Sequence, residues 1–225
     1  MTAISKRAAA LLRSKIFIWI VLVIPGLWAA VPILRQDPTV MADPLKYLLH
    51  HFGFVACVLL AVVLSLSPWR VLFPRWDVAL AVNRHRRLLG VSVFAYAVLH
   101  LTAQFLHESG WPTFWHDLRK PFLAAGIAIF LILFVLSVTS VNAVARRLGR
   151  RRWKRIHRLI YPAAGLAAYH QAAARKLFPM QVVWIFGPVV ILEIARIVRL
   201  AMNRRDDARR GSPADHRAAA GSRAA

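Results

Sequence analysis

Long apolar runs alternate along the chain with short basic segments. Six runs contain no Lys, Arg, Asp or Glu: Ile16–Leu34, Tyr47–Trp69, Leu88–Leu106, Pro121–Ala145, Leu159–Ala174 and Leu177–Leu192. A bilayer core of about 30 Å is crossed by roughly 20 apolar residues in a helix. The last two runs are short, so the charged residues beside them have to snorkel outward. The pattern predicts an all-α fold, a polytopic membrane bundle of six transmembrane helices.

The basic residues fall on alternate sides of these runs. Of the 31 Lys and Arg residues, 25 lie in the N-terminal segment, the second and fourth loops and the stretch from Arg196 onward. The positive-inside rule therefore predicts that both termini are cytoplasmic. Most of the net charge of +22 is then explained by the basic residues of the predicted cytoplasmic segments, which set the orientation in the membrane. This reading disfavours nucleic acid as a partner and favours anionic lipid head groups.

Three regions follow from this topology. Residues 1–15 form a basic cytoplasmic N-terminus, residues 16–200 a six-helix transmembrane domain, and residues 201–225 a cytoplasmic tail. The tail is rich in Ala, Arg, Gly and Ser, and we expect it to be disordered. The first run resembles a secretory signal ending in Leu27-Trp28-Ala29-Ala30, but its removal would break the charge alternation, so we expect an uncleaved first span.

The amino-acid composition limits the kinds of protein and of metal site that the chain can form. Hydrophobic residues make up 59% of the chain and charged residues only 18%, which is not the composition of a soluble protein. The single cysteine, Cys57, excludes a disulfide framework and cysteine-ligated metal centres. The loops are short and carry neither a dinucleotide fingerprint nor a Walker loop. Any metal would therefore need histidine ligands.

Two histidines lie at a matched depth in the predicted bundle. His100 comes twelve residues after Leu88, about 18 Å along a helix, and His170 comes eleven residues after Leu159, about 17 Å. Both spans run from inside to outside. Facing imidazoles in an apolar slot suit bis-histidine ligation of a haem that carries electrons. The alternative is that each histidine only bridges to a neighbouring helix.

Two further histidines are weaker candidates. His157 lies at the inner mouth of the fifth span and could ligate a second haem, although it lies roughly 140° from His170 around an ideal helix. Its obvious partner, His85, lies among arginines and is more simply a solvated loop residue. His51, near the outer end of the second span, is either a cofactor or quinone contact or, more simply, an interfacial histidine. Glu193 and Arg196 are spaced for a local ion pair.

Several motifs together resemble one family. They are Arg86-Arg87-Leu88-Leu89-Gly90, Leu99-His100-Leu101, Thr139-Ser140, Leu148-Gly149-Arg150 with Trp153, His157 and Tyr161, and His170. The combination resembles the MsrQ (YedZ) family within the ferric-reductase-like transmembrane superfamily. The resemblance covers about Asp43 to Leu200.

The resemblance implies a bacterial inner-membrane protein with haem b, and with FMN also reported for the family. Such a subunit takes electrons from the quinone pool. It delivers them to a periplasmic molybdopterin-containing subunit, MsrP-like, which reduces methionine sulfoxide in oxidised proteins. His100, His157 and His170 match the haem-ligand histidines of the family. The chain is thus expected to be a non-catalytic electron-transfer subunit of an oxidoreductase complex.

Two other functions compete with this expectation. A ferric or cupric reductase shares the haem core, but no stretch of the chain is long enough to house its nicotinamide and flavin domain. A transport or scaffold protein whose histidines only bridge helices would be colourless.

Overall fold

The computed structural model describes residues 11–108, 116, 119–174 and 180–210, with side chains as far as residue 206. Within these ranges the chain forms helices and turns and no strand, which confirms the all-α expectation. The principal helices are α2 (Lys15–Trp28), α5 (Pro44–Leu72), α7 (Arg86–His107), α9 (Pro121–Val138), α10 (Asn142–His157), α11 (Ile160–Ala173) and α12 (Met180–Arg210). Shorter helices are α3 (Ala30–Leu34), α4 (Pro38–Met41) and α6 (Asp77–Asn83).

The start of helix α5 is fixed by two residues that favour the first turn of a helix. The Asp43 side chain accepts a hydrogen bond from the Lys46 N–H at 3.0 Å, and Pro44 occupies the first helical position. An aspartate cap satisfies a free backbone donor, and proline at the first position has a backbone angle that suits a helix. These residues fix the start of the central helix of the bundle.

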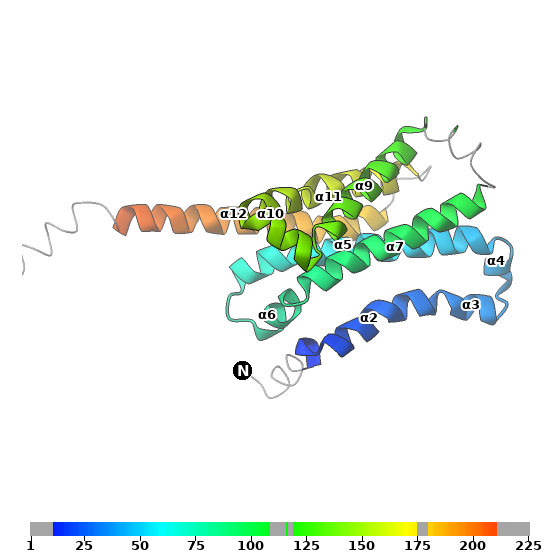
Figure 1. The fold of residues 1–225 in the computed structure, drawn as a ribbon, viewed down its shortest axis with the longest axis horizontal. Helices are drawn as coiled ribbons and strands as arrows, with labels where there is room; N and C mark the ends of the chain where they lie inside the picture. Colours follow the sequence, from blue (N-terminus) through cyan, green and yellow to red (C-terminus); the bar gives the residue numbers. More distant parts are fainter. Residues whose placement is uncertain (1–10, 109–115, 117–118, 175–179, 211–225) are drawn as a thin grey trace, which may run out of the picture.

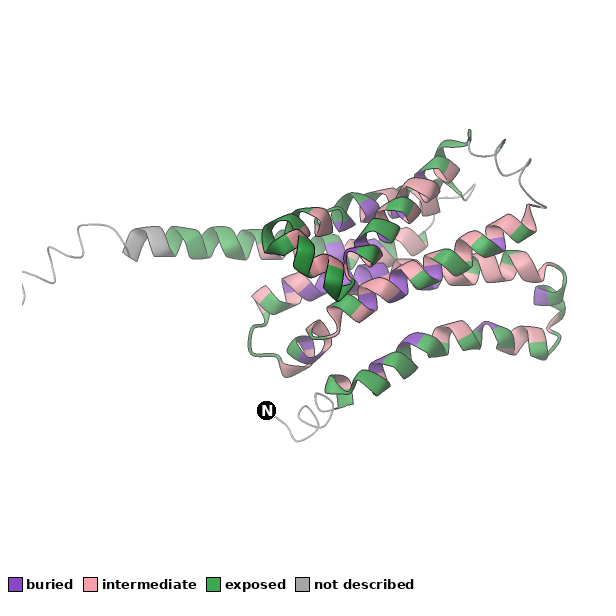
Figure 2. Cartoon of the chain, in the orientation of Figure 1, coloured by how far each residue is buried: buried purple, intermediate pink, exposed green. Residues whose placement is uncertain are grey.

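Helix α5 packs most extensively against α7 and also against α12, while α9 packs against α7 and α11 (Figure 1). The core contains Leu60 and Leu64 of α5, Val93 of α7, Leu133 of α9 and Ala167 of α11. Buried parts of the helices gather toward the middle of the bundle (Figure 2). Helix α2 lies along one side of the bundle. It is tied there by the Tyr96 hydroxyl, which donates to the Leu22 carbonyl at 2.6 Å.

The bundle has two distinct ends. One, which we call the cavity end, carries the N-terminal ends of α5 and α9 and the C-terminal ends of α7 and α11. The other, the arginine end, carries α6, α10 and the start of α7. Helix α2 begins at the arginine end, and α12 runs past it, beyond the rest of the bundle (Figure 1).

Four helices, α5, α7, α9 and α12, are long and apolar enough to cross a membrane. The other two expected spans contain α2 and α11, of 14 residues each. Large apolar side chains lie on the outside of the helices, such as Ile16 at 74% and Trp184 at 75% exposed. An apolar exterior of this kind suits lipid, so the chain is a membrane protein.

Two expected boundaries differ from the structure. The fourth run was expected to continue to Ala145, but α9 ends at Val138. There the Thr139 hydroxyl donates to the Val135 carbonyl at 2.7 Å and the Ser140 hydroxyl to the Leu136 carbonyl at 2.8 Å. Hydroxyls that bond back to carbonyls compete with the helical hydrogen bonds and help to end the helix here.

The arginine-rich segment after this turn is helix α10, not the loop that its charge suggested. Helix α12 also continues to Arg210, ten residues into the segment expected to be a tail. The last apolar run begins at Leu177, which lies outside the described residues, and its helix begins at Met180.

Candidate functional site

His100 extends from α7 toward α5. Its Nδ1 donates to the Leu49 carbonyl at 2.8 Å. The ring lies directly over Gly53, where a Cβ atom would come within 2.8 Å of Nδ1. Glycine is therefore required for this close approach, and the hydrogen bond leaves Nε2 as the nitrogen with a free lone pair.

His170 repeats the arrangement between α11 and α9. Its Nδ1 donates to the Phe122 carbonyl at 2.6 Å. A Cβ atom on Gly126 would come within 2.9 Å of its Cε1. In both cases the carbonyl belongs to the residue four positions before the glycine. The hydrogen-bond acceptor and the glycine that makes room for the ring therefore lie about one helical turn apart.

The two imidazoles lie together. Their ring centroids are 6.0 Å apart and their planes are nearly perpendicular, at 89°. A metal ion bound at about 2 Å to one nitrogen of each ring would hold the ring centres roughly 6 Å apart. The two residues that the sequence predicts at equal depth thus lie next to each other, with their rings edge to face.

Both rings line a cavity of about 210 Å³ between α5, α7, α9 and α11. Most of its walls are apolar and include Leu60, Val93, Phe130 and Leu133. The apolar walls surround two imidazoles, and a backbone carbonyl fixes each ring and leaves its Nε2 available. These are the ligands and the environment that a haem needs. The surrounding residues therefore match the cofactor that the sequence suggested.

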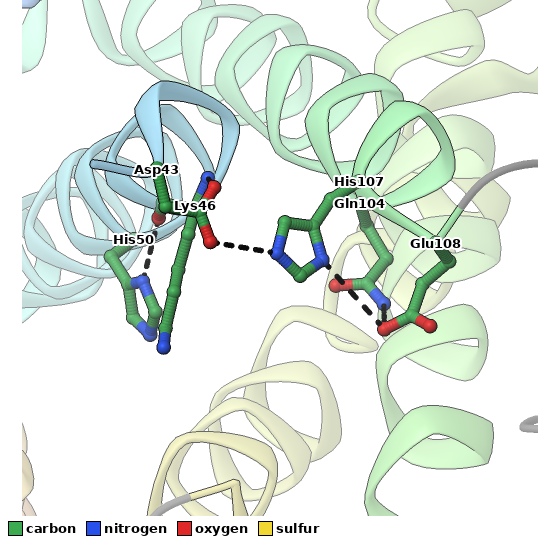
Figure 3. Close-up of polar contacts among 6 residues, drawn as sticks. All are labelled: Asp43, Lys46, His50, Gln104, His107 and Glu108. Carbon is green, nitrogen blue, oxygen red and sulfur yellow. Dashed lines mark hydrogen bonds and ion pairs between the residues drawn. The ribbon is translucent and has the colours of Figure 1, made fainter. Parts of the chain in front are cut away.

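The cavity end is polar at its rim. His50, Gln104 and Glu108 line the outer part of the cavity. Figure 3 shows His107 between two carboxylates, with Nε2 3.2 Å from Asp43 Oδ2 and Nδ1 3.9 Å from Glu108 Oε1. The Lys46 N–H, and then His107, lower the pKa of the Asp43 carboxyl. These contacts join the start of α5 to the end of α7.

His157 lies elsewhere, at the end of α10. Its Nε2 is 3.2 Å from the Thr139 hydroxyl, and its ring stacks on Trp153 with centroids 3.9 Å apart. Burial, and then the charges of Arg86 and Arg87, lower the pKa of His157 to about 4, so the ring is neutral at pH 7. It does not line the cavity between His100 and His170.

Of the remaining candidates, His51, Glu193 and Arg196 have structural contacts. His51 Nε2 donates to the Pro25 carbonyl at 2.7 Å and so ties α5 to α2. His85, expected to be a solvated loop residue, is instead half-buried just before α7, and its Nε2 is buried without a hydrogen-bond partner. Glu193 and Arg196 form the expected ion pair at 2.8 Å, and Arg196 also donates to the Tyr161 hydroxyl at 3.3 Å. Among the described residues, no group of three or more His, Cys, Asp or Glu side chains could hold a metal ion.

Sequence reasoning missed Gly53 and Gly126. The available signal was a glycine inside an otherwise apolar run, which costs helix stability unless another group needs the space. Which group approaches each glycine depends on helix pairing, so the sequence alone could not assign them to the histidines.

Comparison with known proteins identifies relatives over most of the chain. Residues 52–168 match the family model of the ferric reductase like transmembrane component. Three proteins named "Protein-methionine-sulfoxide reductase heme-binding subunit MsrQ" are similar over most of their length. The protein of Cronobacter sakazakii is 37% identical, over 67% of this chain and 76% of its own.

The second relative, from Xanthomonas axonopodis pv. citri, is 33% identical, over 76% of this chain and 78% of its own. The third, from Rhodospirillum rubrum, is 29% identical, over 85% of this chain and 90% of its own. The family model covers more than half of the chain and includes His100 and His157. On these matches, the chain belongs to the MsrQ family of haem-binding membrane subunits, within the ferric-reductase-like transmembrane proteins.

Proposed function

We propose that this chain is an electron-transfer subunit of the bacterial inner membrane, with a haem b held between His100 and His170. It takes electrons from the quinone pool and delivers them to a periplasmic molybdopterin-containing methionine-sulfoxide reductase that repairs oxidised proteins. The chain crosses the membrane six times with both termini in the cytoplasm. Anionic lipids surround its basic cytoplasmic face, and FMN is a second cofactor.

The observation that carries this proposal is the facing pair of imidazoles in the apolar cavity. Each Nδ1 is occupied by a backbone carbonyl, at 2.8 Å for His100 and 2.6 Å for His170. These bonds fix the tautomer and the ring orientation, which is what the outer hydrogen bond of a metal-binding histidine commonly does. Two imidazole ligands leave haem iron no open position, so the cofactor would carry single electrons and not bind a substrate.

The protein residues position and insulate this site. Apolar side chains of α5, α7 and α9 form most of the cavity wall, and Gly53 and Gly126 let the rings approach the helices. The polar rim at the cavity end is the natural place for exchange with a soluble partner. The names of the relatives refer to a methionine-sulfoxide reductase, which supports the choice of acceptor.

The resemblance extends the proposal to His157 as a third ligand. Its neutral ring is able to bind a metal, but it lies outside the cavity of the other two histidines. A haem count separates the possibilities. A count of two haems per chain that falls to one in His157→Gln would support the third ligand, and a count that does not change would contradict it.

The test of the main proposal is a reduced-minus-oxidised absorption spectrum of the purified full-length chain, with haem b counted as pyridine haemochrome. We expect a low-spin b-type spectrum. His100→Ala and His170→Ala should lose this haem while still inserting into the membrane, and the exposed His116→Ala should retain it. The proposal would be rejected if both ligand variants retained haem, or if the wild-type chain stayed colourless when supplied with haem. His100 and His170 would then only form hydrogen bonds between helices.

A ferric or cupric reductase is the second candidate, because the matching family model carries the name of a ferric reductase. It shares the haem site and differs in its electron acceptor. Reoxidation of the reduced chain separates the two functions. Faster reoxidation by the periplasmic reductase with methionine sulfoxide supports the first, and faster reoxidation by ferric chelates supports the second.

A further inference from the structure

A second hollow, of about 290 Å³, lies at the arginine end, far along the bundle from the histidine cavity. The first turn of α7 supplies Arg87. Helix α10 supplies the rest of the lining, which consists of Asn142, Ala145, Arg146, Arg150 and Trp153. Three exposed arginines therefore border one hollow, and they come from two helices that are far apart in the sequence.

The hollow is held by specific contacts. Arg87 Nη1 donates to the Asn142 side-chain carbonyl, which joins the start of α7 to the start of α10. The Trp153 indole donates to the Thr139 carbonyl at 3.1 Å, which fixes one wall. Gly149, with φ of 70°, breaks α10 between Arg146 and Arg150, so these two side chains come from different helical segments. The site is thus built by the fold and is more than a row of arginines on one helix.

The positive charge of the hollow is not neutralised by acidic residues in its own lining. No carboxylate belongs to the lining, although three of its residues are cationic. Converging like charges repel, and an anion bound between them relieves that repulsion. Guanidinium groups present paired N–H donors that match the oxygens of a phosphate.

The position along the bundle indicates where such an anion comes from. The apolar part of α9 ends at Val138, and α10 begins only at Asn142. On the other wall, Arg87 is followed directly by the apolar residues Leu88 and Leu89. The hollow therefore lies at the boundary between the apolar zone and water, the level of lipid phosphates, where tryptophan is also common.

We propose that the hollow lined by Arg87, Arg146 and Arg150 is a phosphate-binding site that takes the head group of an anionic phospholipid. The site deepens the lipid contact in the proposed function by assigning it to specific residues. It does not depend on the haem or on the electron path.

The experiment uses the full-length chain in detergent, with bound lipid counted by native mass spectrometry. Phosphatidylglycerol is titrated against phosphatidylcholine. We expect clear preference for phosphatidylglycerol. Arg146→Gln/Arg150→Gln should weaken its binding by at least about tenfold, because each substitution removes a charge-assisted hydrogen bond to the phosphate, and one such bond is worth roughly tenfold in affinity. Arg146→Lys/Arg150→Lys should lose less, since it keeps the charge and loses only the paired donors.

The matched control is Arg151→Gln/Arg152→Gln, which removes the same charge from exposed positions of the same helix outside the hollow. It should bind phosphatidylglycerol within about twofold of wild type. Equal losses in the two glutamine variants would overturn the proposal, because they would reflect net charge alone. Binding that does not depend on Arg146 and Arg150 would also overturn it.

A soluble phosphate has the same chemistry, so inorganic phosphate and FMN form the second arm. Suppose that phosphate or FMN binds to the wild-type chain, that this binding is lost in Arg146→Gln/Arg150→Gln, and that phosphatidylglycerol shows no selective binding. That result would keep the phosphate site and reject a lipid as the source of the phosphate. The haem spectrum of each sample is recorded in parallel. Normal haem with lost lipid binding shows that a variant is folded, and missing haem with normal lipid binding contradicts only the proposed function.

Discussion

The histidine cavity depends on two glycines as much as on its two histidines. Each imidazole donates to a carbonyl of the neighbouring helix and lies over the glycine one turn further on, Gly53 below His100 and Gly126 below His170. The matched depth of the histidines could be predicted from sequence spacing. The glycine contacts could not, because they depend on how α5 meets α7 and how α9 meets α11.

We predict that Gly53→Ala and Gly126→Ala weaken haem binding by about tenfold or more, the usual cost of disturbing the residues that orient a metal ligand. The added methyl group would lie 2.8 Å from His100 Nδ1 or 2.9 Å from His170 Cε1, so each ring has to move. Haem affinity is measured by titration of the apoprotein.

Gly90→Ala and Gly165→Ala are the matched controls. They lie in α7 and α11, and apart from the chain on either side of the glycine, a Cβ atom at either position meets no neighbouring group within 4 Å. Both should bind haem as wild type does. Wild-type affinity in Gly53→Ala and Gly126→Ala would show that the rings do not hold haem in the positions described here.

At the scale of elements, the apolar helices could be read from the sequence and the polar one could not. The runs Tyr47–Trp69 and Leu88–Leu106 lie within α5 and α7, which extend only a few residues further. Helix α10 was missed because its arginines resemble a cytoplasmic loop. Its fold depends on local contacts of Asn142, Thr139 and Trp153, which leave no hydrophobic pattern.

Gly149 gives a test of this helix. Its φ of 70° and ψ of 161° fall in a region that is essentially restricted to glycine. Gly149→Ala should cost about 1–3 kcal/mol and lower the Tm by several degrees. Gly165→Ala, in a regular helix, should leave the Tm unchanged or raise it slightly. A Tm that does not fall in Gly149→Ala would mean that α10 is continuous.

At the scale of the whole molecule, the two ends of the bundle differ in chemistry. The cavity end has the polar residues His50, Gln104 and Glu108 of the histidine cavity and the carboxylate of Asp43. The arginine end has the basic hollow and the start of α2. A membrane that separates these ends would give one face to a soluble electron acceptor and the other to anionic lipid.

This orientation is testable by cysteine labelling in spheroplasts of an expressing bacterium. In a Cys57→Ser background, Met41→Cys marks the cavity end and Arg151→Cys the arginine end, both at exposed positions. Since basic segments stay in the cytoplasm, an impermeant maleimide should label Met41→Cys in intact spheroplasts and Arg151→Cys only after the membrane is opened. The reverse pattern would place the histidine cavity toward the cytoplasm, where a periplasmic acceptor could not reach its rim.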